Sequence, residues 1–158
     1  MSGFPPRGRA GAARAALLLI AAAGLGGCAH LVLLHDPLSA SEHNDLGVAY
    51  ESRAELDLAA SEYRAALRLD PRFNRARVNL GNVEAARGRW PRAERCYRAA
   101  LADSADDADA LNNLAVALLR QRRKLPEAQA LAQRAVALGG PRDSLYRATL
   151  EEVRAVSR

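Results

Sequence analysis

The sequence contains only two cysteines, Cys28 and Cys96, among its 158 residues. A disulfide framework needs several paired cysteines, so none is expected here. The sequence is also poor in catalytic groups, because no histidine follows Asn44 and Lys124 is the sole lysine. It lacks a glycine-rich phosphate loop and a nucleophile motif. We therefore predict that the protein is not an enzyme and needs no cofactor.

Aromatic residues make up only 4% of the chain, and β-branched residues are scarce. Alanine and leucine supply most of the 49% hydrophobic content. These two residues favour helices, whereas aromatic and β-branched residues favour strands. A chain of this length suits one modest domain. The composition therefore predicts an all-α fold in one folded unit.

The net charge of +5 is concentrated at the N-terminus. Residues 1–27 contain Arg7, Arg9 and Arg14 and no acidic residue, so the remaining chain carries a net charge of only +2. A strongly basic domain is the electrostatic signature of nucleic-acid binding. Because most of the excess charge lies in the first 27 residues, we expect no nucleic-acid partner.

Residues 16–30, ALLLIAAAGLGGCAH, form an apolar run that follows these arginines. A basic start, an apolar stretch of about 7–15 residues and small residues at its end are typical of a cleaved secretory signal. Leu25, Gly26, Gly27 and Cys28 resemble the lipobox of bacterial lipoproteins. That resemblance implies a signal peptide over residues 1–27 and a lipid attached to Cys28.

A retained transmembrane helix over residues 15–34 is the alternative, since about 20 residues span a bilayer. The glycines between residues 24 and 27 and the polar His30 disfavour such a helix. Both interpretations tether the chain to a membrane of the bacterial cell envelope, facing the periplasm. By analogy with enteric lipoproteins, Ala29 favours the outer membrane because it is not an aspartate.

Residues 28–39 are interpreted as a lipidated tether, in which Pro37 ends any regular structure. His30, His35 and His43 lie near one another in the sequence. They lack the cysteine partners or the i, i+4 helical spacing of a metal site. We predict no metal site.

The rest of the chain repeats with a period of 34 residues. The residues that recur are Leu46-Gly47, Leu80-Gly81 and Leu114-Ala115, and the segment YRAAL at residues 63–67 and 97–101. This period with these residue types resembles the tetratricopeptide repeat, a helix–turn–helix unit. The resemblance implies a short right-handed solenoid of three stacked repeats, at residues 40–73, 74–107 and 108–141, and a capping helix at residues 142–158.

Small residues are expected where the two helices of each repeat approach closely. We predict that Gly47, Gly81 and Ala115 on the first helices face, in order, Ala59, Ala93 and Ala128 on the second helices. The large side chains, among them Tyr63 and Tyr97, are expected to fill the space between neighbouring pairs. Pro91 and Pro126 suit the first turn of a second helix, where no N–H is needed.

In this family the first helices line a concave groove that holds an extended or helical segment of another protein. Asparagine side chains suit that role because each offers a donor and an acceptor to a peptide backbone. We expect a protein partner and no small-molecule substrate. The resemblance places on or near the groove Asn44, Val48, Arg75, Val78, Asn79, Asn82, Asp109, Asn112, Asn113, Val116 and Arg120.

The clamp with which chaperone-binding members of the family hold a C-terminal carboxylate is not reproduced. Asn79 matches it, but Asn44, Asp109 and Asn113 stand at its basic positions. A second candidate surface is the basic turn edge, where an acidic partner or anionic lipid headgroups would bind. Its residues are Arg87, Arg89, Arg92, Arg120, Arg122, Arg123 and Lys124.

Together these features predict a membrane-anchored adaptor that recruits a partner protein in its groove. Two alternatives stay open. One is an assembly factor of a pilus or secretion apparatus, because small lipoproteins of this plan resemble pilotins. The other is a structural tether that associates with itself through the ends of the stack.

The lipid attachment is tested by Cys28→Ser, which removes the sulfur that would carry the lipid. We expect loss of both signal cleavage and incorporation of an alkyne-tagged fatty acid, measured by gel shift and click labelling. A transmembrane helix is indifferent to so small a change. A Cys28→Ser protein of unchanged size that stays fully membrane-bound would therefore contradict lipidation.

Overall fold

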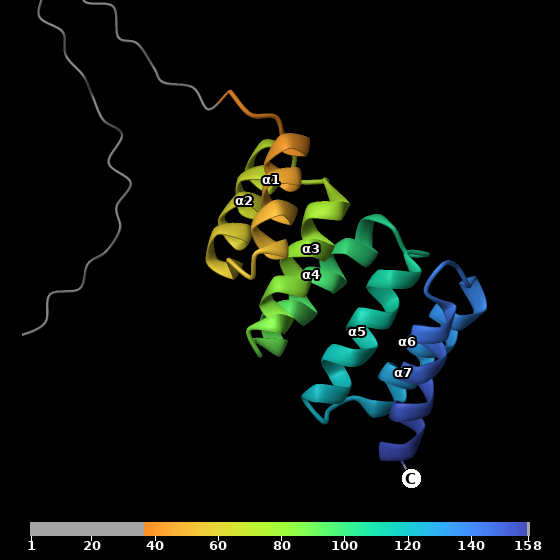
Figure 1. The fold of residues 1–158 in the computed structure, drawn as a ribbon. Coiled ribbons are helices and arrows are strands. Elements are labelled where there is room, and N and C mark those ends of the chain that lie inside the picture. Colours follow the sequence, from red (N-terminus) through yellow and green to blue (C-terminus); the bar gives the residue numbers. More distant parts are fainter. Residues whose placement is uncertain (1–36, 158) are drawn as a thin grey trace, which may run out of the picture. The chain divides into compact units, whose positions relative to one another are not determined.

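Seven α-helices and no strand occur in the computed structural model within the residues that it describes, 37–157 (Figure 1). The predicted all-α class is therefore confirmed. The signal peptide, Cys28 and the tether up to residue 36 lie outside the described residues. The helices are α1 (Ala40–Ser52), α2 (Leu56–Leu69), α3 (Asn74–Ala86), α4 (Trp90–Asp103), α5 (Ala108–Arg120), α6 (Leu125–Leu138) and α7 (Asp143–Val156).

Local sequence signals explain where several helices begin. Ser39 caps α1 in a reciprocal capping box, in which its hydroxyl accepts from the Glu42 N–H and the Glu42 carboxylate accepts from the Ser39 N–H. Asp107 caps α5 by accepting from the Ala110 N–H at 2.9 Å. Pro91 and Pro126 lie in the first turns of α4 and α6, as predicted.

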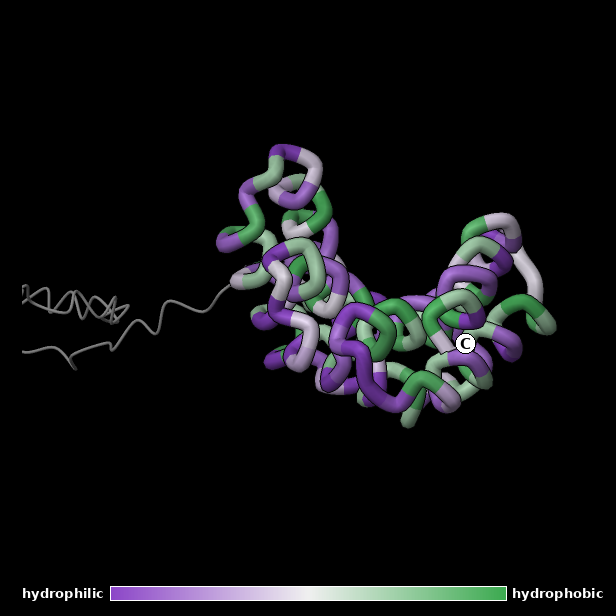
Figure 2. Tube along the Cα trace, turned by 90° about the horizontal axis from the view of Figure 1, so that it is seen from below, coloured by the Kyte–Doolittle hydropathy of each residue, from purple (hydrophilic) through white to green (hydrophobic). Residues whose placement is uncertain are grey.

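Successive helices pack as antiparallel pairs, α1 with α2, α3 with α4 and α5 with α6, and α7 packs on α6 and α5. The backbones of the odd-numbered helices α1, α3, α5 and α7 also approach one another in series, whereas those of α2, α4 and α6 stay apart. The odd-numbered helices therefore line the inner side of the curve that this unit follows in Figure 2. Within residues 37–157, no helix is long and apolar enough to cross a membrane.

In each of the first two pairs a glycine lies directly against a tyrosine ring. A Cβ atom added to Gly47 would lie 2.5 Å from a ring carbon of Tyr63, and one added to Gly81 would lie 2.5 Å from Tyr97. The alanines predicted to face these glycines, Ala59 and Ala93, are fully buried, but the atoms nearest to an added Cβ belong to the tyrosine rings. Tyr63 and Tyr97 pack inside their own helix pair rather than only between pairs, and both are buried.

The turns within the three pairs share one left-handed backbone position. It falls on Ala54, Gly88 and Arg122, which are 34 residues apart and have φ angles of 59°, 69° and 49°. Only glycine adopts this region without a steric penalty, so Ala54 and Arg122 carry strain that Gly88 avoids. Lys124, in the longer third turn, has a φ of 51° as well.

Glycine substitution at a strained turn should therefore stabilise the fold. We expect Ala54→Gly to raise the free energy of unfolding by about 0.5–1 kcal/mol, and Gly88→Ala to lower it by about 1 kcal/mol. A Cβ on Gly88 would meet nothing within 4 Å, so that loss reports backbone strain alone. The measurement is guanidinium unfolding followed by circular dichroism.

The control is Ala137→Gly in α6, where the backbone is helical and the side chain is exposed. Glycine there should destabilise the protein by about 0.5–1 kcal/mol. If Ala54→Gly destabilises as much as this control does, the turn does not hold the left-handed conformation in solution.

Candidate functional site

The predicted groove residues lie on the odd-numbered helices, along the inner side of the stack. Neighbouring helices are joined there by asparagine side chains. The Asn79 amide of α3 donates to the Asn44 oxygen of α1 at 3.0 Å, and the Asn113 amide of α5 donates to the Asn82 oxygen of α3 at 3.0 Å. These bonds tie each first helix to the next.

Two of the predicted asparagines are not on the open surface. Asn44 and Asn112 are each only 1% exposed. Asn44 uses both ends of its amide, because it also donates to Asp45 at 3.2 Å. The Asn112 oxygen is buried without a hydrogen-bond partner among the described residues. Both side chains are therefore buried near the groove and are not part of its exposed surface.

Asn79 and Asn82 each keep one polar atom unbonded within the described residues. The Asn79 oxygen accepts no hydrogen bond, and the Asn82 amide nitrogen donates none. The two residues are three apart on α3 and so share one helix face. Together they present the acceptor and the donor that a peptide group of a bound chain requires.

An inner pocket of about 260 Å³ lies beside Asn82, between α3 and α5 and over α4. Its floor is formed by Tyr97 and Trp90. The Tyr97 hydroxyl donates to the Asn82 oxygen at 2.9 Å, and burial raises the pKa of that hydroxyl, so it stays a donor at neutral pH. The lining residues are Asn82, Ala85, Ala86, Trp90, Tyr97, Asn113 and Val116. Most of these are apolar, so the pocket suits an apolar side chain.

The remaining predicted groove residues differ in accessibility. Val48 is 47% exposed, Arg75 is exposed, and Val78 is partly buried and packed against the core. Arg120 pairs with Glu152 of α7 at 3.1 Å. Asp109 accepts from the Tyr146 hydroxyl at 2.8 Å and pairs with Arg142 at 3.3 Å.

Most side chains of the predicted basic turn edge form ion pairs within the protein. Glu84, which stands where the first repeat has Tyr50, is buried, and its carboxylate lies 2.6 Å from the Arg89 side chain and 2.9 Å from that of Arg64. Arg87 pairs with Asp57 and also lies 4.0 Å from Glu84. The cluster therefore holds the first two repeats together through buried charge.

A second buried carboxylate, Glu94, joins the second repeat to the third in the same way. It lies 3.0 Å from Arg98 and 2.8 Å from Arg123, and it accepts from Gln121 at 3.0 Å. Burial alone would raise the pKa of Glu94, but these hydrogen bonds and charges hold it below its usual value. Sequence reasoning missed both glutamates, although Glu84 at an aromatic position was a visible signal.

Among the three histidines considered as metal ligands, only His43 lies within the described residues. Its Nδ1 atom is 2.7 Å from the Glu62 carboxylate, and its side chain is buried. No group of three or more His, Cys, Asp or Glu side chains in residues 37–157 is arranged to hold a metal ion.

Comparison with known proteins identifies the family. The tetratricopeptide repeat family matches residues 44–94 and 78–143, which cover most of the chain. The chain therefore belongs to the tetratricopeptide repeat family. No curated protein matches the sequence.

Solved structures show the same fold at low sequence identity. The first tetratricopeptide domain of Spaghetti (RPAP3), bound to the HSP90 peptide SRMEEVD, is 20% identical with a TM-score of 0.70, covering 75% of this chain and 94% of that one. The Yersinia enterocolitica type III secretion chaperone SycD, in complex with a peptide of the translocator YopD, is 18% identical with a TM-score of 0.67, covering 75% and 94%. YrrB, described as having an unusual peptide-binding site, is 24% identical with a TM-score of 0.67, covering 75% and 60%.

Proposed function

We propose that this protein is a membrane-anchored adaptor of the bacterial cell envelope that binds a segment of a partner protein on its inner face. The observation that carries the proposal is the inner pocket beside the unbonded polar atoms of Asn79 and Asn82. An apolar side chain of the partner enters the pocket, and the two amides bond the backbone next to it. The lipid on Cys28 would hold the adaptor at the membrane, with the outer membrane favoured.

The side chains of the inner face favour binding of an internal segment of the partner over binding of its C-terminal carboxylate. Asp109 keeps a carboxylate at one position where the carboxylate clamp has a basic residue, and Asn44 is buried at another. A free C-terminal carboxylate would therefore meet no basic side chain supplied by either position. Two of the similar structures hold peptides, of HSP90 and of YopD, which supports peptide binding as the general mode.

The site is tested by photo-crosslinking in cells with benzoylphenylalanine at Val116, on the inner face. The control places the same group at Ala137, an exposed position on α6. We expect one defined protein adduct from position 116 that is absent at position 137. No adduct at 116, or the same adduct at both positions, would contradict binding on the inner face.

Blocking the pocket should then abolish binding of the crosslinked segment, synthesised as a peptide. Ala86 lines the pocket, is exposed and ends α3, so Ala86→Arg fills the space without disturbing the core. We expect its Kd, measured by fluorescence polarisation, to rise at least tenfold. Ala137→Arg makes the matched change near the end of α6 and should leave the Kd unchanged.

A further inference from the structure

The outer side of the stack carries two grooves that are built alike. Because the backbones of α2, α4 and α6 stay apart, the odd-numbered helix beneath forms the floor of each gap between them. The first outer groove lies between α2 and α4 over α3 and has a volume of about 430 Å³. The second outer groove lies between α4 and α6 over α5 and has a volume of about 310 Å³.

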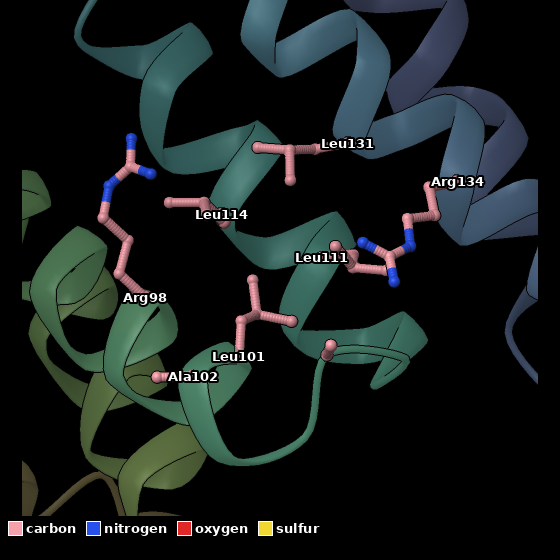
Figure 3. A pocket seen from close by; sticks show the side chains of 8 residues that line it. Arg98, Leu101, Ala102, Leu111, Leu114, Leu131 and Arg134 are labelled. Carbon is pink, nitrogen blue, oxygen red and sulfur yellow. The ribbon is translucent and has the colours of Figure 1, made fainter.

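The lining of the second groove repeats that of the first at the 34-residue period. The equivalent pairs are Arg64 and Arg98, Leu67 and Leu101, Leu80 and Leu114, and, after the extra residue of the third turn, Cys96 and Leu131. Figure 3 shows that Leu101, Leu114 and Leu131 of the second groove surround a common space, with Arg98 and Arg134 on opposite sides. Both grooves therefore offer an apolar floor with an arginine at the rim.

The two grooves differ in whether the positive charges of their arginines are paired with carboxylates of the protein. In the second groove Arg98 bonds Glu94 and Glu127, and Arg134 bonds Asp106. Those cations are neutralised within the protein. Of the two grooves, only the first can therefore carry uncompensated positive charge.

The first groove is lined by one carboxylate and four arginines, which are Arg64, Arg77, Arg92 and Arg95. Arg64 bonds the carboxylate, Glu84, and Arg77 bonds Asp103. Arg92 comes no closer than 4.0 Å to Glu84, and no ion pair of Arg95 occurs within the described residues. Arg92 and Arg95 are three apart on α4, so they stand on one face of the helix beside the apolar floor.

We propose that the first outer groove binds an acidic segment of a partner protein, distinct from the segment bound on the inner face. One apolar side chain of that segment packs on Leu67, Leu80 and Cys96. Aspartate or glutamate residues on either side of it pair with Arg92 and Arg95. Charge complementarity supports this occupant, because guanidinium groups bind carboxylates in a planar, two-pronged geometry that is strengthened beside apolar surface.

A protein segment fits better than a lipid headgroup because the apolar floor recurs in the following repeat. A linear chain that leaves the first groove can place its next apolar side chain on Leu101 and Leu131 of the second groove, which are partly exposed. A single lipid headgroup has no second apolar group that could pack on the floor of the second groove. The arrangement gives the adaptor two faces, an amide-rich inner one and an arginine-rimmed outer one.

The test uses the full chain in detergent and a fluorescein-labelled decapeptide, EDLEELLDEL, with its neutral twin QNLQQLLNQL. Binding is measured by fluorescence polarisation. Occupancy of the groove is measured by the rate at which N-ethylmaleimide modifies Cys96, read by mass spectrometry of the peptide that contains it. Cys96 lines the groove, and burial raises the pKa of its thiol, so its modification is slow enough to follow at pH 8.

We expect the acidic peptide to bind at least tenfold more tightly than the neutral twin and to slow Cys96 modification. Arg92→Gln with Arg95→Gln should raise the Kd at least tenfold, and both side chains are exposed, so the fold should persist. Arg53→Gln with Arg122→Gln removes the same charge from exposed turns and should leave the Kd unchanged. Ala86→Arg, which blocks the inner pocket, should also leave the Kd of the acidic peptide unchanged. A failure of the inner-face proposal can therefore be told apart from a failure of this one.

Three results would overturn the proposal. The first is equal weakening by the two arginine pairs, which would indicate attraction by net charge alone. The second is binding of the acidic peptide without any change in the Cys96 rate. The third is protection of Cys96 by phosphatidylglycerol vesicles but not by the peptide, which would assign the groove to a membrane.

Discussion

The close contact of a glycine with a tyrosine ring sets the spacing of the first two helix pairs. A side chain on Gly81 would overlap Tyr97, so the backbone of α3 lies directly against the ring. That position brings the Tyr97 hydroxyl to Asn82, whose oxygen also accepts from Asn113 of the next pair. The same contact thus packs the core and orients the amides of the candidate site.

In the third pair, residues of other sizes occupy the positions that hold glycine and tyrosine in the first two pairs. Ala115 stands where the earlier pairs have glycine, and Ala132 stands where they have tyrosine. Both alanines are fully buried in one cluster. A larger residue on one helix is therefore balanced by a smaller one on the other, as close packing requires.

The 34-residue period predicted the helices, their order and the prolines of α4 and α6, because these depend on local sequence. It did not predict that a tyrosine ring lies against each glycine of the first two pairs, since that depends on how far the ring reaches across the pair. It also missed the burial of Asn44 and the role of Glu84, because a polar residue at a packed position becomes evident only once its partners are placed. The buried glutamates in turn explain why most turn arginines are not free to bind.

A double-mutant cycle on Gly81 and Tyr97 tests the central contact most directly, with free energies of unfolding measured in guanidinium. We expect Gly81→Ala to cost about 1–3 kcal/mol in the parent protein, because overpacking beside the ring forces a shift. In a Tyr97→Ala background, which imitates the third pair, the same change should cost close to nothing, giving a coupling of at least about 1 kcal/mol. Additive costs in the two backgrounds would contradict the contact on which the candidate site depends.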